Sequence, residues 1–286
     1  MRRLQINHTT SYEYSEPVTL LPHQLLLRPR EGHDIRIESS ILEISPSHKI
    51  NWHRDVYGNS VAIVSFSEPT TTLKIASEVV IQHYVETPLD FVIVDYAAKF
   101  PFQYNPIERT DLLPYQVSLY PKDTPALKKW IKQVWQPGQL TDTFLFLDSL
   151  NKAIVDEFNY MAREEPGVQT PEQTLEKGSG SCRDFATLFI EACRYVGLAA
   201  RFVSGYLHAP ASEQGHGATH AWSEVYLPGA GWKGFDSTSG NIVGSDQIAV
   251  AVNRDPEAIP PVSGNFVGPL EPPPIMRVQV KVNAIK

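Results

Sequence analysis

The fold is decided by Gly178-Ser-Gly-Ser-Cys-Arg-Asp-Phe-Ala-Thr-Leu-Phe-Ile-Glu-Ala-Cys-Arg-Tyr-Val-Gly197. Its two opening glycines end an irregular loop, and apolar or small residues then recur at helical spacing, which predicts a helix with one buried stripe. Ser181 is suited to cap the start of this helix together with Asp184, and Gly197 is suited to end it. The helix start would place Cys182 beside free backbone N–H groups and the positive end of the helix dipole, which favour a thiolate. A small buried side chain at a helix start is the alternative interpretation of this cysteine.

Composition and charge limit the possible partners. The chain has 286 residues, which predicts two domains, and 42% of the residues are hydrophobic, as in a soluble globular protein. A net charge of −7 without a basic cluster argues against a nucleic-acid partner. No apolar run approaches the ~18 residues of a membrane span, and the start of the chain lacks the apolar part of a secretory signal. We therefore expect no membrane partner.

The cysteine pattern bears on cofactors and on location. Cys182 and Cys193 lie on one predicted helix, too far apart to form a disulfide bond. This indicates reduced thiols and a cytoplasmic location. The sequence contains no paired-cysteine metal pattern, EF-hand loop or glycine-rich phosphate loop, so it predicts no metal and no cofactor.

Residues 1–90 predict an N-terminal antiparallel β-sandwich-like domain. Alternating apolar and polar residues indicate strands at 4–14, 34–44, 60–66 and 73–84. Proline, glycine, asparagine and aspartate separate these strands, and no helix intervenes, which is typical of a small sandwich. Residues 91–123 contain several prolines and no clean period, so we interpret them as an inter-domain connection that packs across both domains.

Residues 124–286 predict a second domain with helices packed on an antiparallel sheet. Helices are expected at 124–135, at about 142–163 and from Cys182, followed by strands at 199–207, 219–227 and 231–236. Helices that precede an antiparallel sheet are the pattern of an α+β fold. A proline-rich segment at 256–274 and a final strand at 276–282 are assigned to the same domain.

Three residue types needed for nucleophilic catalysis occur in this second domain. A nucleophilic cysteine needs a base within hydrogen-bond reach and a third group that orients the base. Cys182 at the helix start, His220 on one strand and Asp236 on the next strand could supply that set.

The hypothesis requires a particular pairing of the two strands. His220 and Asp236 can share one face only if the strands pair in even register, because successive side chains alternate between faces. A loop over 227–231 would pair Tyr226 with Trp232 and set the carboxylate diagonal to the imidazole. A loop shorter by one residue would send the carboxylate to the opposite face.

Three motifs in order resemble the bacterial transglutaminase-like family of cysteine proteases. They are Gly-Ser-Cys182-Arg-Asp-Phe-Ala-Thr-Leu, Gly-Leu-Ala-Ala-Arg201-Phe-Val-Ser-Gly-Tyr206 and Thr-His220-Ala-Trp-Ser-Glu-Val-Tyr-Leu-Pro-Gly-Ala-Gly-Trp-Lys-Gly-Phe-Asp236. The N-terminal sandwich and the segment 248–264 are also similar to this family, so the resemblance covers essentially the whole chain. The chain departs from the usual pattern at Arg183, where the family usually has glutamine, at 236–240 and around Asn253. These departures concern substrate preference more than catalysis.

The resemblance implies a papain-like core and a function. It implies that Cys182 is the nucleophile, His220 the base and later the acid, and Asp236 the orienting group of a hydrolase. The substrate would be a peptide or isopeptide amide, cleaved through a thioester acyl-enzyme. Two alternatives stay open: a protein-glutamine transamidase that cross-links proteins, and a non-catalytic binding protein on the same fold.

Other residues receive weaker assignments. Tyr160 is a candidate oxyanion donor, and Trp222 is expected to form a wall of the site or to pack on the sheet. Arg201 and Glu224 are expected to form a structural pair, and Cys193 to lie in the core. The loop 208–218 is a candidate lid, and its His208 and His216 are alternative bases.

Overall fold

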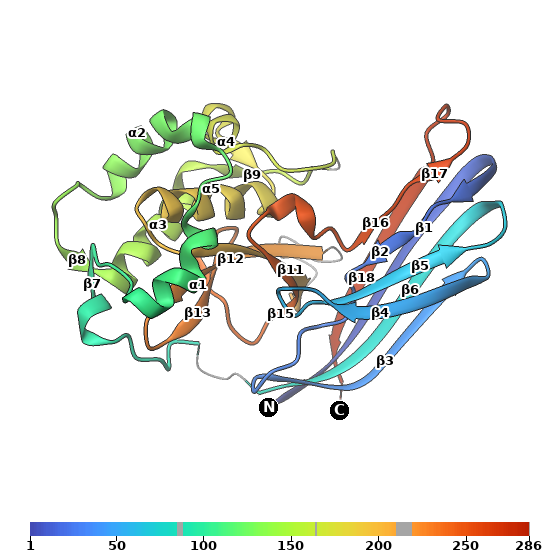
Figure 1. Cartoon of the computed structure of the whole chain (residues 1–286), viewed down its shortest axis with the longest axis horizontal. Helices are drawn as coiled ribbons and strands as arrows, with labels where there is room; N and C mark the ends of the chain where they lie inside the picture. Colours follow the sequence, from blue (N-terminus) through green and yellow to red (C-terminus); the bar gives the residue numbers. More distant parts are fainter. Residues whose placement is uncertain (85–87, 164, 210–218, 286) are drawn as a thin grey trace.

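The structure is a computed structural model that describes residues 1–84, 88–163, 165–209 and 219–285. Its N-terminal part, at the right of Figure 1, is a sandwich of two antiparallel sheets. One sheet has the order β17–β1–β6–β3 with β18 also paired to β1, from Arg2–Leu20 (β1), Ile35–Ser45 (β3), Thr70–His83 (β6), Phe266–Val267 (β17) and Ile275–Ala284 (β18). The other has the order β16–β2–β5–β4, from His23–Leu25 (β2), His48–Arg54 (β4), Ser60–Phe66 (β5) and Val262–Ser263 (β16). Alternate residues of β1 are buried, as the period-2 pattern predicts, and they pack between the sheets.

The final strand belongs to this sandwich and not to the second domain. Strand β18 forms where the sequence predicts it, but it pairs with β1 from Leu4↔Ala284 to Glu13↔Ile275. Its assignment to the core is therefore corrected by the observed register. The two termini consequently lie close together at one end of the sandwich (Figure 1). A strand's own alternation does not specify its partner, because any edge strand offers the same hydrogen-bonding groups.

The second part is a helical layer on a five-stranded antiparallel sheet, as the α+β prediction requires. The helices are Pro106–Gln116 (α1), Thr124–Val134 (α2), Thr143–Glu157 (α3), Pro171–Lys177 (α4) and Cys182–Tyr195 (α5). The sheet has the order β14–β13–β12–β11–β15, from Ala200–Leu207 (β11), Thr219–Leu227 (β12), Gly231–Asp236 (β13), Asn241–Ile242 (β14) and Gln247–Asn253 (β15). Short strand pairs join Lys99–Phe100 (β7) to Thr141–Asp142 (β8) and Asn159–Tyr160 (β9) to Ser179–Gly180 (β10), and 3₁₀ turns occur at Asp95–Ala97, Pro121–Asp123 and Pro256–Ala258.

Helix α5 is the centre of this part and is buried on almost all sides. The sequence predicts one buried stripe, yet every residue from Asp184 to Arg194 is buried, because α1, α2, α3, α4, β11 and β12 all contact the helix. Its charged side chains are paired, as buried charges must be: the Arg194 guanidinium lies 2.7 Å from the Glu191 carboxylate. Among the described residues, no helix is both long and apolar enough to span a membrane.

The connection between the parts contains a helix that the sequence analysis missed, α1. This connection contacts both parts, as predicted, because the Tyr115 ring packs edge-on against Tyr57 of the sandwich and Trp232 of the core. Asn59 also joins the parts by exchanging hydrogen bonds of 2.8 and 2.9 Å with the backbone of Val252. The sandwich is therefore held directly against the edge strand of the core sheet.

Candidate active site

Helix α5 begins at Cys182 with the capping that the sequence predicts. The Asp184 carboxylate accepts a hydrogen bond of 2.8 Å from the backbone N–H of Ser181. Gly197, just after the helix, adopts a φ of 89°, which glycine reaches without steric cost. Cys182 thus lies in the first turn of a buried helix, and its side chain is only partly exposed.

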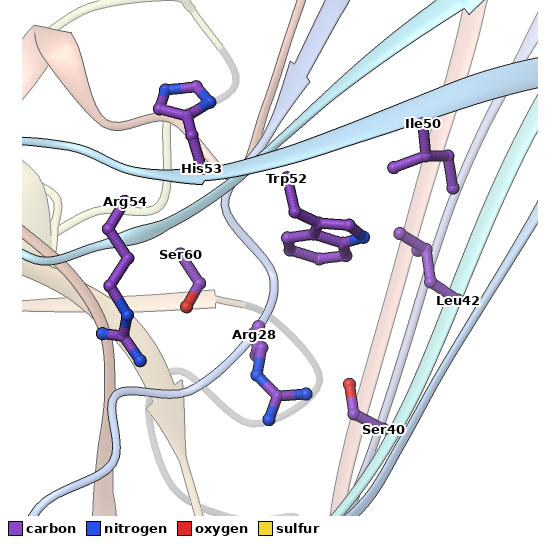
Figure 2. Close-up of a pocket in the computed structure, with 8 residues that line it drawn as sticks. All are labelled: Arg28, Ser40, Leu42, Ile50, Trp52, His53, Arg54 and Ser60. Carbon is purple, nitrogen blue, oxygen red and sulfur yellow. The ribbon is translucent and has the colours of Figure 1, made fainter.

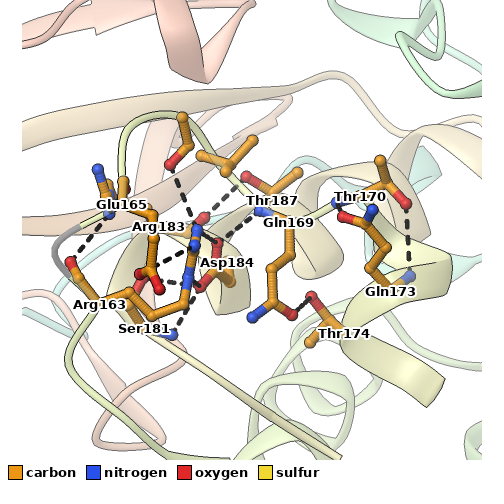
Figure 3. A network of polar contacts seen from close by, with 12 residues as sticks. Arg163, Glu165, Gln169, Thr170, Gln173, Thr174, Ser181, Arg183, Asp184 and Thr187 are labelled. Carbon is orange, nitrogen blue, oxygen red and sulfur yellow. Dashed lines mark hydrogen bonds and ion pairs between the residues drawn. The ribbon is translucent and has the colours of Figure 1, made fainter. Parts of the chain in front are cut away.

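The Asp184 carboxylate also fixes the loop that precedes α4 (Figure 3). It accepts hydrogen bonds of 2.8 and 3.0 Å from the Arg163 guanidinium and one of 2.7 Å from the backbone N–H of Gln169. Burial alone would raise the pKa of Asp184, but Arg163 and the hydrogen bonds from Gln169 and Ser181 lower it. Asp184 therefore remains an anion that holds the helix of Cys182 in place.

Arg183, where the sequence departs from the family pattern, contacts the same loop. Its guanidinium donates hydrogen bonds to the backbone carbonyls of Arg163 and Glu165, at 3.2 and 3.1 Å. The side chain thus stabilises a loop beside Cys182.

His220 and Asp236 meet in the hairpin register that the sequence predicts. Strands β12 and β13 pair Tyr226 with Trp232 and Ser223 with Phe235. This register sets Asp236 beside His220 on one face, and the His220 Nε2 donates a hydrogen bond of 2.8 Å to the Asp236 Oδ2. Both side chains are almost fully buried, at 1% and 2% exposure.

Cys182 also affects the imidazole of His220. The His220 Nδ1 is buried and makes no hydrogen bond within the described part of the chain. Burial would lower the pKa of His220, but the charge and hydrogen bond of Asp236 and, after them, the Cys182 thiol raise it. The Cys182 thiol is therefore close enough to the imidazole to affect its pKa, and Nδ1 is the ring nitrogen that Asp236 leaves available.

Two further groups hold Asp236, and the sequence analysis did not find them. The Gln247 amide donates a hydrogen bond of 3.1 Å to Oδ2, and the backbone N–H of Thr238 donates one of 3.0 Å to Oδ1. Burial would raise the pKa of Asp236, but His220 and these two donors lower it. Gln247 comes from β15, which no local pattern relates to Asp236.

The two weaker candidates lie in different surroundings. Tyr160 follows α3 in β9, which pairs with Gly180, so its ring is beside the start of α5. Burial raises the pKa of Tyr160 to about 12, and the nearby charges of Cys182 and Asp236 act in the same direction. Trp222 is 1% exposed, packs with Val203 and Val252, and leaves its Nε1 without a hydrogen-bond partner within the described residues.

The surroundings of the site include several of the other predicted residues. Arg201 and Glu224 form an ion pair of 2.7 Å, as expected, and Cys193 is fully buried. A cavity of about 380 Å³ adjoins the imidazole and is lined by Leu207, His208, His220, Asp236, Thr238, Ser239, Asn241, Asp246 and Gln247. His208 lies 3.4 Å from Asp246 there, while His216 and most of the predicted lid fall outside the described residues. No three histidine, cysteine or acidic side chains among the described residues are grouped to hold a metal ion.

Comparison with known proteins agrees with this architecture. Residues 4–82 match the bacterial transglutaminase-like N-terminal region, and residues 134–237 match the transglutaminase-like superfamily. The uncharacterized protein Rv2569c of Mycobacterium tuberculosis is 30% identical over 277 residues, which cover 92% of this chain and 87% of the relative. The uncharacterized protein ML0607 of Mycobacterium leprae is 24% identical over 94% of both chains.

A solved structure shares the whole fold. A candidate cysteine protease of Cytophaga hutchinsonii is similar with a TM-score of 0.77 and 17% identity, over 100% of this chain and 91% of the other. Both the sandwich and the helical core are therefore part of the shared architecture. The chain belongs to the bacterial transglutaminase-like family, with the family's N-terminal region joined to a transglutaminase-like core.

Proposed function

We propose that this protein is a cysteine hydrolase that cleaves amide bonds of peptides or proteins. Cys182 acts as the nucleophile, His220 as the base and acid, and Asp236 as the group that orients the imidazole. The observation that carries the proposal is the buried His220–Asp236 hydrogen bond of 2.8 Å, which leaves Nδ1 available while the nearby Cys182 thiol raises the pKa of the imidazole. Membership of the transglutaminase-like superfamily supports the same class of chemistry.

The mechanism follows from the protonation states of this arrangement. The raised pKa of His220 keeps the imidazole charged beside Cys182, which favours an imidazolium–thiolate pair. The thiolate attacks the amide carbonyl, a C–S bond forms, and the carbonyl electrons move to the oxygen. As this oxyanion collapses, the C–N bond breaks and Nδ1 gives its proton to the leaving amine. Nδ1 then takes a proton from water, which attacks the thioester and releases the acid and the thiolate.

The acceptor of the acyl group separates hydrolysis from cross-linking. We expect water to be the acceptor, because the cavity beside His220 is lined mainly by polar side chains. A peptide library incubated with and without an excess of a primary amine, and followed by mass spectrometry, tests this. Hydrolysis predicts cleaved or deamidated peptides in both samples. Amine-modified peptides as the main product would favour transamidation, and no product in either sample would favour a binding protein.

Tyr160 is proposed as the side-chain donor to the oxyanion, together with the backbone N–H of Cys182. Because its pKa is raised to about 12, the phenol keeps its proton at neutral pH and can donate it in a hydrogen bond. We expect Tyr160→Phe to lower kcat by about 10²–10³-fold with little change in KM, as loss of one oxyanion donor does. Steady-state kinetics on a peptide found in the library measures both constants. A change in KM alone would indicate a packing role against Phe185, the ring it contacts.

We propose a cytoplasmic location because both cysteines are free thiols. The nucleophile must remain reduced, and Cys182 has no disulfide partner because Cys193 is buried further along the same helix.

A further inference from the structure

The sandwich has an opening between its two sheets (Figure 2). Strand β3 ends one sheet and β4 ends the other, so two edge strands border this opening. A groove of about 640 Å³ lies there, lined by Arg28, Ser40, Leu42, Ile50, Trp52, His53, Arg54 and Ser60. Along β4, Ile50, Trp52 and Arg54 share the face that is turned into the groove.

The groove combines an apolar strip with positive charge. Trp52 is 49% exposed and lies between the apolar side chains of Leu42 and Ile50 and the guanidinium groups of Arg28 and Arg54. No carboxylate is among the lining residues, although the whole chain has a net charge of −7. A half-exposed tryptophan beside two arginines is a combination typical of binding surfaces.

The two arginines keep hydrogen-bond donors for a ligand. Arg54 donates one hydrogen bond of 2.9 Å to the Gly58 carbonyl and makes no ion pair among the described residues. Arg28 lies 3.4 Å from the Glu31 carboxylate, with both side chains about a third exposed, which makes a weak surface pair. Each guanidinium has five N–H donors, so both can still donate hydrogen bonds to a carboxylate.

The positive charge continues from the groove toward the core. Burial lowers the pKa of Arg30, and the nearby charges of Arg201 and Arg54 lower it further, against the opposite effects of Glu224 and Asp55. Arg30 and Arg54 therefore lie close enough for their positive charges to repel, while Glu224 and Asp55 act against that repulsion. An acidic ligand would relieve this repulsion.

The groove is held rigidly against the catalytic part. Arg30 donates a hydrogen bond of 2.7 Å to the Asn59 side chain, and Asn59 bonds to the backbone of Val252 in β15. Strand β15 also carries Gln247, which contacts Asp236. A ligand in the groove would thus have a fixed position relative to Cys182.

We propose that this groove binds an extended segment of the polypeptide substrate in which acidic residues flank apolar ones. The inference rests on the proposed function only in calling the ligand a substrate. Binding to the groove does not itself depend on catalysis. The carboxylates would pair with Arg28 and Arg54, and an apolar side chain would lie on Trp52. The peptide backbone would hydrogen-bond to the free edge of β3 or β4, as in strand addition. An extended peptide fits this opening because its side chains alternate between the groove and solvent.

Direct binding tests the proposal without turnover. The full chain carrying Cys182→Ala is titrated into a fluorescein-labelled, N-acetylated peptide Asp-Ser-Leu-Ser-Asp-Ser-Leu-Ser-Asp, whose aspartate and leucine side chains share one face when it is extended, and fluorescence anisotropy is recorded at low and at moderate salt. We expect saturable binding that weakens as salt rises. We expect at least tenfold weaker binding for Asn-Ser-Leu-Ser-Asn-Ser-Leu-Ser-Asn and for Asp-Ser-Gly-Ser-Asp-Ser-Gly-Ser-Asp.

Matched variants locate the binding. The double variant Arg28→Gln with Arg54→Gln should weaken binding at least tenfold, and Trp52→Ala at least fivefold. The control removes two charges from β3 and β4, the strands that border the groove, by Arg36→Gln with Lys49→Gln, whose side chains are exposed and do not line the groove. It should bind as the parent does. Circular dichroism and thermal unfolding show that each variant is folded, and Trp52→Phe, which keeps an aromatic ring, should retain most of the binding.

Three results would overturn the proposal. The first is no saturable binding of the acidic peptide, and the second is equal loss in the test and control variants. The third is binding of an acidic polysaccharide such as polygalacturonate that depends on Arg28 and Arg54 while the peptide does not bind. Failure of the proposed function would give a different result. The protein with Cys182 intact would then hydrolyse no peptide, while the Cys182→Ala protein would still bind the acidic peptide.

Discussion

Replacement of Cys182 by alanine is expected to abolish amide hydrolysis while the fold is retained. Removal of the nucleophile of a catalytic triad lowers kcat by about 10⁶-fold in a serine protease. The Cys182 side chain is small and partly exposed, so its loss should change the free energy of unfolding by less than about 1 kcal/mol. Turnover of a library-derived peptide and thermal unfolding measure the two effects.

Cys193 on the same helix provides the matched control. It is fully buried, and burial raises the pKa of its thiol, so it should react slowly with iodoacetamide at neutral pH. Cys182 should be alkylated much faster, and His220→Ala should slow that reaction because the thiolate loses its counterion. Cys193→Ala should keep full activity and lose about 1 kcal/mol of stability through the small cavity. Equal, slow alkylation of both cysteines would contradict the nucleophile assignment.

Asp236→Asn should be the second most damaging substitution. An amide cannot stabilise the imidazolium, and the equivalent change in a serine protease triad lowers kcat about 10⁴-fold. With the carboxylate removed, burial dominates, and we expect the pKa of His220 to fall below that of the parent protein. NMR titration of the His220 ring protons measures this directly: the parent should remain protonated above pH 8, and the variant should not.

A second carboxylate of the same cavity gives the control for this substitution. Asp246 lines the cavity but contacts Arg2 and His208 instead of His220. Asp246→Asn should therefore leave the His220 titration unchanged and alter activity by only a few fold. If both variants lose activity equally, or if the pKa of His220 does not move in Asp236→Asn, the orienting role of Asp236 is wrong.

The same pair predicts how stability depends on pH. The raised pKa of His220 contributes stability that is complete below the ordinary histidine value of about 6.5 and is lost as pH rises through the raised value. The lowered pKa of Asp236 contributes stability that is complete above about pH 4 and is lost as pH falls. The stability difference between the parent and Asp236→Asn should therefore be greatest between about pH 4 and 6.5.

The start of α5 and the β12–β13 hairpin could be predicted from the sequence because their signals are local. The helical period, the cap residues and Gly197 all lie within or beside the helix they delimit. The loop length between His220 and Asp236 determined which residues pair, and a slip of one residue would have moved the carboxylate to the other face. The ion pair of Arg201 and Glu224 was also predicted from the sequence, and the two residues face each other across β11 and β12.

The remaining features depend on contacts between distant segments, for which a local pattern carries no signal. Gln247 meets Asp236 only because β15 joins the sheet beside β11, and Arg163 meets Asp184 only after a loop folds back over α5. The groove exists only because β3 and β4 end different sheets. By itself, the sequence determined the helix that begins at Cys182 and the register that brings His220 to Asp236. Tertiary structure alone decided which buried groups hold that pair in place and that β18 returns to β1, because those contacts form only when segments far apart in the chain pack together.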